Sequence, residues 1–289
     1  MRRLVLAGAL ALAPVAAQAQ TAPDQTDIIV TGRPEADRKA AEKFVWAISV
    51  RSDNQLARFH QPVCPVVIGM PKPYSTTIED RIRATAVAAG VAVAKKARCS
   101  PNLIVVIAES GSALVADIRK NRPGWLEGVA SADIDALIAP GPTRAWSVTS
   151  LRNEDGRGLG VPPPGSGATG DPLGDKPMLR VMTASIIKQP TRQDMEASFV
   201  VIDQAATLGL TLRQIADYAA MRGLARTRPP GEKSDIGTIL AVFDPSAANR
   251  PREMTSADTA YLAALYKSPG TEAAVNERAR IARRISKGK

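Results

Sequence analysis

The feature that most constrains the fold is a pair of apolar runs separated by one helical segment. Leu103-Ile104-Val105-Val106-Ile107 is continuously apolar, and Cys64-Pro65-Val66-Val67-Ile68-Gly69 is a shorter run rich in β-branched residues. Between them, Thr77 to Ala94 carries apolar residues at helical spacing. Apolar runs without alternation are typical of strands that are buried on both faces of a sheet. The pattern therefore predicts a βαβ unit.

Further helices and strands are expected on both sides of this unit. They are a helix at Glu35 to Val50, two short helices at Ser112 to Asn121 and Ser131 to Ile138, strands at Arg144 to Leu151 and Leu179 to Ile187, and helices at Thr191 to Leu208, Thr211 to Arg226, Thr255 to Tyr266 and Thr271 to Ser286. Thr211 and Gln214 have the spacing of a capping box. The expected fold class is α+β or α/β, with a four-stranded mixed sheet that starts as βαβ, is packed by helices and is followed by a helical C-terminal third.

The first 34 residues indicate export. Met1-Arg2-Arg3, the apolar run Leu4 to Ala16 and Ala17-Gln18-Ala19 have the three regions of a secretory signal peptide, with cleavage after Ala19. The apolar run of about 13 residues is shorter than the roughly 20 that span a bilayer. We therefore expect a periplasmic or secreted protein, in which residues 20–34 form a flexible leader.

One domain is expected to follow this leader. It covers residues 35–268 and contains a Gly/Pro-rich stretch at 153–177, which includes Pro162-Pro163-Pro164-Gly165. Such a composition does not bury a core, so the stretch is expected to be a surface loop. A basic helix at 269–289 ends the chain.

The scarcity of histidine and cysteine excludes several kinds of site. The chain has 1 His and 2 Cys, so neither a site with two histidines nor a four-cysteine metal site is possible within one chain. In an oxidising compartment, Cys64 and Cys99 are expected to form a structural disulfide. Two unpaired buried thiols remain the alternative. No metal or other cofactor is expected.

Positive charge suggests the kind of partner. Lys and Arg number 38 against 28 Asp and Glu. The candidate partner-binding residues lie on the C-terminal helix and are Arg278, Arg280, Arg283 and Arg284. Such a helix can bind an anionic envelope surface or an acidic protein, and the alternative is a solvated helix that packs its weak apolar face on the domain. The sequence does not identify the partner, and no nucleic acid is expected for an exported chain.

Two carboxylates, Asp203 and Glu109, are the candidate functional residues for an enzyme. Either could serve a hydrolase that works without histidine. A Ser-His-Asp or Cys-His site would need His60, and a lone histidine beside Gln61-Pro62 is more often structural. The turn at residues 108–112 has one glycine and lacks the pattern of a phosphate-binding loop.

The order of elements resembles a known enzyme family. A βαβ unit, two strands and a helix that runs into Leu208-Gly209-Leu210 resemble the upper subdomain of zincin-type metallopeptidases. This resemblance places Ile202, Asp203 and Ala206 where the family has its first histidine, its glutamate and its second histidine. Isoleucine and alanine cannot bind zinc, so the resemblance implies a decayed domain without metal.

Segments such as Arg98-Cys99-Ser100-Pro101-Asn102-Leu103 also resemble a family of uncharacterised signal-peptide-bearing proteins of proteobacteria, which implies no activity.

These features allow three functions. The favoured one is an exported, non-catalytic protein with an interaction or structural role, and the alternative is a histidine-independent hydrolase or a decayed zincin-like peptidase. A distant alternative is DNA binding, because Ala205, Gly209 and Ile215 have the spacing of a helix-turn-helix. That reading requires the second helix to be exposed along Arg213, Asp217 and Arg222.

Overall fold

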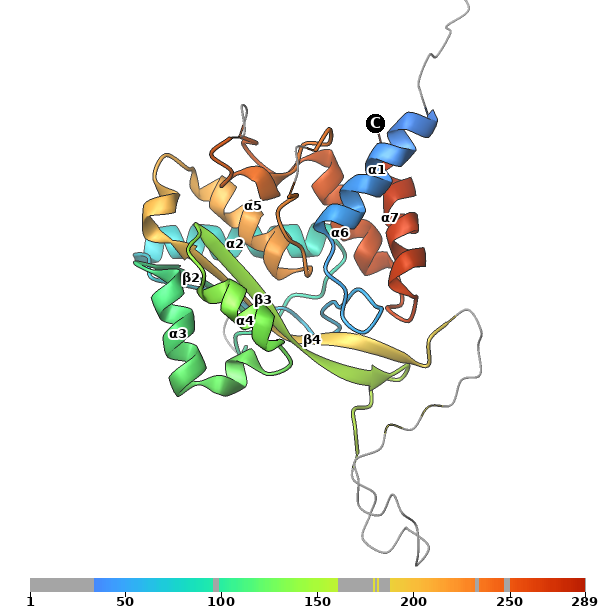
Figure 1. Cartoon of the computed structure of the whole chain (residues 1–289), viewed down its shortest axis with the longest axis horizontal. Helices are drawn as coiled ribbons and strands as arrows, with labels where there is room; N and C mark the ends of the chain where they lie inside the picture. Colours follow the sequence, from blue (N-terminus) through green and yellow to red (C-terminus); the bar gives the residue numbers. More distant parts are fainter. Residues whose placement is uncertain are drawn as a thin grey trace, which may run out of the picture. The chain divides into compact units, whose positions relative to one another are not determined.

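The computed structural model describes residues 34–95, 99–160, 179, 181, 188–231, 234–246 and 250–288. At its centre is a four-stranded sheet in the order β1-β2-β4-β3. The strands are β1 (Pro65–Ile68), β2 (Leu103–Ala108), β3 (Thr143–Asn153) and β4 (Thr191–Asp203). β1, β2 and β4 run parallel, and β3 pairs antiparallel with β4 along one edge of the sheet (Figure 1). The predicted class, a mixed sheet packed by helices, is confirmed.

The predicted βαβ unit is formed by β1, helix α2 (Lys72–Ala88) and β2. Ile78 and Ile82 of α2 are fully buried against the sheet, as their helical spacing predicts. Gly69 ends β1 with φ of +88°, and a Cβ atom there would lie 2.0 Å from the carbonyl oxygen of Ile107. Only glycine fits this turn without strain, because other residues rarely adopt positive φ and the neighbour is backbone.

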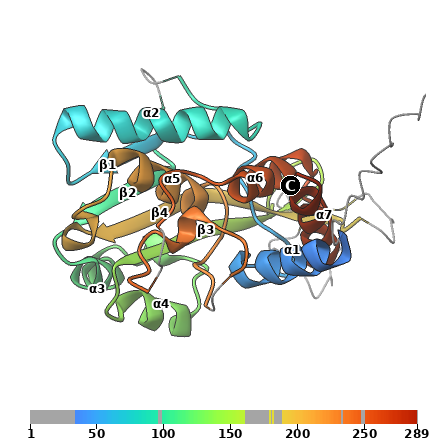
Figure 2. The same ribbon diagram turned by 90° about the horizontal axis from the view of Figure 1, so that it is seen from above.

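Helices cover both faces of the sheet, and Figure 2 shows α2 on one side and α3 and α4 on the other. The face with α2 also packs α5 (Leu212–Gly223), in one continuous hydrophobic core. The opposite face packs α3 (Gly111–Asn121), the short helix η2 (Pro123–Leu126) and α4 (Ser131–Ile138). Its core is centred on stacked Trp146 and Phe199, whose ring centroids lie 4.9 Å apart.

Three helices complete the unit beside the α5 face. They are α1 (Pro34–Ile48), α6 (Ser256–Lys267) and α7 (Ala274–Lys287), and a short helix η4 (Ile239–Ala241) precedes α6. Helix α7 packs between α1 and α6. It therefore belongs to the same compact unit as the rest of the chain from Pro34 onward.

The expected helix at Thr191 to Leu208 is wrong. Residues 191–203 form β4, and only Gln204–Thr207 form a helical turn, η3. Phe199-Val200-Val201-Ile202 is an apolar, mostly β-branched run that pairs with β2 and β3 and whose side chains enter the hydrophobic cores on the two faces of the sheet. Burial between two strands outweighs the capping signals at Thr191 and Asp194. Most of the expected strand at 179–187 lies outside the described residues, and Leu179 and Val181, which are described, are not in a strand.

This correction removes two structural resemblances. The zincin family requires a helix where the chain has β4, and Ile202 and Asp203 lie on that strand, while Ala206 lies in η3. A helix-turn-helix also lacks its first helix.

The second helix of that motif, α5, is buried from Gln214 to Gly223 and cannot enter a DNA groove. The predicted capping box of Thr211 and Gln214 does open α5.

The predicted disulfide between Cys64 and Cys99 is confirmed, with a Cα–Cα distance of 6.0 Å. It joins the residue before β1 to the segment that leads into β2. No helix in the described part of the chain is both long and apolar enough to cross a bilayer. The predicted signal peptide lies outside the described residues, as do residues 20–33 of the predicted leader and most of the Gly/Pro-rich stretch, while Pro34 begins α1.

Candidate functional site

Asp203 stands at the carboxyl end of β4 and holds the helices of the α3 face. Its Oδ1 accepts hydrogen bonds from the backbone N–H of Gly111, at 2.9 Å, and from Nη1 of Arg144, at 2.7 Å. The same guanidinium donates to Ser112 Oγ and to the carbonyl of Leu137. Asp203 therefore connects the start of α3 and the end of α4 to the sheet. Glu109 is exposed and shares no hydrogen bond with Asp203 in the described part of the structure.

The four candidate arginines of α7 divide into two pairs. Arg278 is buried: it donates to Oγ and the carbonyl of Ser49 and stacks over Trp46, 4.3 Å from the ring centroid. Arg280 forms ion pairs with Glu272 and Glu277. Only Arg283 and Arg284 are exposed. Of the expected basic surface, Arg278 is thus used inside the fold and Arg280 is paired with two carboxylates.

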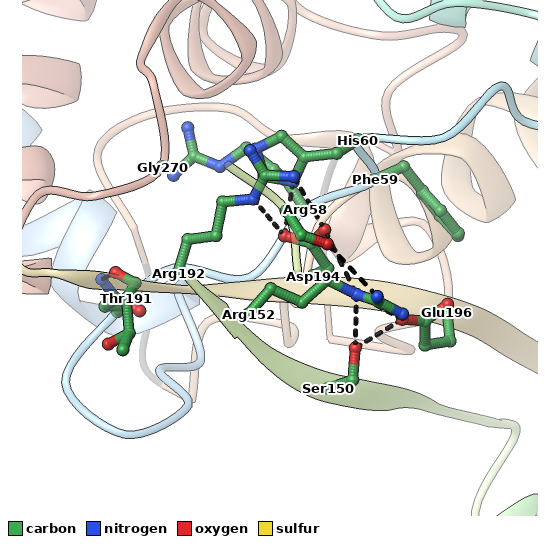
Figure 3. A network of polar contacts seen from close by, with 12 residues as sticks. Arg58, Phe59, His60, Ser150, Arg152, Thr191, Arg192, Asp194, Glu196 and Gly270 are labelled. Atoms are coloured by element: carbon green, nitrogen blue, oxygen red, sulfur yellow. Dashed lines mark hydrogen bonds and ion pairs between the residues drawn. The ribbon is translucent and has the colours of Figure 1, made fainter. Parts of the chain in front are cut away.

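His60 belongs to a polar network at the start of β4 (Figure 3). Its Nδ1 lies 2.8 Å from Oδ1 of Asp194, and Arg192 donates to both oxygens of the same carboxylate. Burial acts to raise the pKa of Asp194, but the contacts with His60 and Arg192 outweigh it and lower that pKa.

No hydroxyl or thiol of the described residues hydrogen-bonds the other nitrogen of His60, Nε2. That atom faces Gly270, where a Cβ would lie 3.1 Å away (Figure 3). The pair therefore links the segment before β1 to β4. No group of three potential metal ligands occurs among the described residues either.

A cavity of about 490 Å³ opens beside β3, and we call it the β3 cavity. Three parts of the fold surround it: the edge strand itself, helix α4, and the end of α5 with the segment that follows. The lining residues are Val50, Val129, Asp133, Ala136, Leu137, Thr143, Arg144, Ala145, Trp146, Ser147, Arg222, Arg226, Thr227, Arg228 and Pro229.

One wall of the β3 cavity is lined by three arginines, Arg222, Arg226 and Arg228. Arg222 is 8% exposed, donates from Nη1 to the Tyr218 hydroxyl at 3.0 Å, and has a buried Nε without a hydrogen-bond partner. Arg226 makes no ion pair among the described residues. Burial lowers the pKa of its guanidinium, although Asp133 acts in the opposite direction. Arg228 donates to the carbonyl of Ala47 at 2.8 Å.

In the described part of the chain, neither Arg222 nor Arg226 forms an ion pair, although Asp133 and Asp53 attract Arg226 electrostatically. Asp133 is the single carboxylate among the lining residues, and it is exposed at the α4 wall. The sequence contains a signal for this wall: Arg222, Arg226 and Arg228 follow one another in a stretch with no acidic residue between Asp217 and Glu232. Sequence reasoning considered only Arg222, because nothing local shows that the end of α5 faces the sheet edge.

Comparisons with known protein families, curated proteins and solved structures found no match for this chain.

Proposed function

We propose that this chain is an exported binding protein that takes an anionic ligand into the β3 cavity. One observation carries the proposal: Arg222 is buried and Arg226 is partly buried, yet neither forms an ion pair with a carboxylate among the described residues. A desolvated charge without a partner is costly. A bound anion removes that cost and supplies charge-assisted hydrogen bonds, which are the strong ones.

The shape of the site agrees with this chemistry. A volume of about 490 Å³ lies within the range of ligand sites, roughly 300–1,000 Å³. The guanidinium group offers a planar fork of donors that matches carboxylate and phosphate oxygens. Apolar side chains at Ala136, Leu137 and Trp146 line the rest of the cavity. Such a site binds a ligand with one charged and one apolar side.

Export is supported by the disulfide and by the leader. The Cys64–Cys99 bond is of a kind that persists in oxidising compartments. The charged, apolar and small-residue regions of residues 1–19 have the pattern of a secretory signal peptide. A periplasmic or secreted location therefore goes with the proposed binding role.

A binding role also fits the use of the candidate catalytic groups. Asp203 is held by Arg144 and Gly111, and the Nδ1 side of His60 is directed at Asp194. Both groups serve contacts between elements of the fold.

The test compares one arginine of the cavity with one outside it. Arg226→Gln removes a cavity charge, and Arg283→Gln removes an exposed charge on α7 as the matched control. Titration calorimetry with citrate, inorganic phosphate and an acidic peptide should show binding that Arg226→Gln weakens about tenfold or more, since a hydrogen bond to a charged group contributes about 1.5–3 kcal/mol. Arg283→Gln should leave binding unchanged. Equal loss in both variants, or no binding of any anion, would refute the proposal.

A further inference from the structure

The open edge of β3 faces the cavity. β3 is the last strand in the sheet order, and the carbonyl of Pro142 accepts a hydrogen bond from the N–H of Asp203 at 2.9 Å. In antiparallel pairing, alternate residues direct their backbone groups to the neighbouring strand. Arg144 and Trp146 therefore bond to β4, while the residues between them direct N–H and C=O groups away from it.

These outward backbone groups are Thr143, Ala145 and Ser147. In the described part of the chain, no backbone or side-chain group hydrogen-bonds them from the open side. All five residues from Thr143 to Ser147 line the cavity. The cavity is thus a groove along an unpaired strand edge.

The opposite side of the groove does not complete the sheet. Val50 and the segment 226–228 pair with each other: the N–H of Val50 donates to the carbonyl of Arg226, and the N–H of Arg228 donates to the carbonyl of Ile48, each at 2.8 Å. Their backbone groups are used in this short bridge. Among the described residues, no strand pairs with the open edge of β3.

We infer that the ligand of the β3 cavity is an extended acidic polypeptide segment that adds to β3 as a fifth strand. The inference rests on the proposed function and names the class of its ligand. Strand addition to an exposed sheet edge is a common mode of peptide recognition, in which backbone bonds give affinity and alternate side chains give specificity.

The two walls of the β3 cavity determine which kinds of side chain should alternate along the ligand. Successive side chains of a strand point to opposite faces. One face of the added strand meets the α5 wall with Arg222, Arg226 and Arg228, which favours acidic side chains. The other meets the α4 wall with Ala136 and Leu137, which favours apolar ones. The expected ligand alternates acidic and apolar residues over about five positions, the length of the lining stretch of β3.

The first experiment tests the backbone bonds on the ligand side. The probe is the peptide acetyl-Glu-Val-Glu-Val-Glu-amide, together with two forms that are N-methylated either on both valines or on the second and third glutamates. Methylation keeps the charge and removes alternate donors. One methylated form should bind the wild-type protein about tenfold or more weakly, while the other retains affinity, since only one set of N–H groups faces β3.

The second experiment tests the protein side with Ala145→Pro. This substitution removes an N–H on the open side and leaves the bonds between β3 and β4 in place, as proline on an edge strand allows. The variant should lose peptide binding and keep citrate binding, which also shows that it is folded. The Arg226→Gln variant should lose both.

The outcomes distinguish strand addition to β3 from the binding of an anion in the β3 cavity. If both methylated peptides bind as tightly as the parent, or Ala145→Pro binds the peptide normally, strand addition is refuted, while an Arg226-dependent affinity for citrate would still support the proposed function. If the wild-type protein dimerises in sedimentation and Ala145→Pro does not, the strand comes from a second copy, and the acidic peptide is refuted. If neither citrate nor peptide binds, both proposals fall.

Discussion

Replacing Arg58 is the sharpest test of how the ends of this domain are joined. Arg58 is 1% exposed, and its Nη2 lies 2.6 Å from both carboxylate oxygens of Glu277 on α7. The same guanidinium donates to the carbonyls of Leu56, Leu265 and Ser268. Arg58→Met keeps much of the side-chain volume and removes every one of these donors.

The cost should be large because the partners stay buried. Glu277 is fully buried and would keep only Arg280, whose Nη2 lies 3.1 Å from it. Breaking a buried ion pair by removing one partner costs about 3–5 kcal/mol. For a domain of this size, that corresponds to a fall in Tm of roughly 6–20 °C. The contact between Glu277 and Arg280 places the expected value at the lower end, about 3 kcal/mol.

Urea unfolding at pH 7, followed by circular dichroism, measures this cost. The double variant Arg58→Met/Glu277→Leu provides the control, because replacing both members of a buried pair by apolar residues is often close to neutral. The double variant should therefore be more stable than Arg58→Met alone. The reasoning would be refuted if Arg58→Met cost less than about 1 kcal/mol, the scale of an exposed ion pair, or if the second substitution added its own full cost.

Three further predictions concern other parts of the fold. The lowered pKa of Asp194 gives stability that is complete above the ordinary aspartate pKa and is lost as pH falls through the folded value. Asp194→Asn should therefore show a shallower loss of unfolding free energy than the wild type between about pH 5 and 2; parallel curves would contradict this. Reducing the Cys64–Cys99 disulfide should cost about 3–4 kcal/mol in urea unfolding with and without dithiothreitol, and no shift in midpoint would count against it. Gly69→Ala should cost about 2 kcal/mol or more, because of its positive φ and the carbonyl of Ile107; an unchanged Tm would show that this turn relaxes freely.

The predictable part of the fold is the part determined by local pattern. The expected βαβ unit is formed by the runs at Val66 and Leu103 and the helix between them, because β-branched apolar runs on either side of a helical pattern are a local signal. The expectation of burial on both faces is wrong for β1, an edge strand whose Ile68 is 52% exposed. The capping box at Thr211 is equally local, and it is present. The disulfide could be predicted because the chain has only two cysteines and begins with the pattern of a secretory signal peptide.

The unpredicted part depends on contacts between distant residues. β4 carries helix-start signals at Thr191 and Asp194, but Asp194 is used to bind His60, 134 positions earlier in the chain by residue number. Its strand character comes from insertion between β2 and β3, which no window of sequence shows. Tertiary context overrides propensity in such cases.

The candidate site was missed for a similar reason. Arg222 to Arg228 is an ordinary basic stretch until α5 places it opposite the edge of β3. The arginines of α7 are the opposite case, in which a basic stretch expected at the surface is partly buried. Arg278 donates to Ser49 and stacks over Trp46 at the end of α1. A count of charges cannot distinguish a surface arginine from one that holds two helices together.

The pairing of Arg58 with Glu277 also limits how early the domain can complete its fold. The two residues are 219 positions apart. At a synthesis rate of about 5–20 residues per second, Glu277 is synthesised roughly 10–40 s after Arg58. A similar interval separates the synthesis of helix α1 from that of α7, against which it packs. A chain that ends before residue 274 lacks this closure, so the domain can complete its fold only when α7 is available to pack against α1.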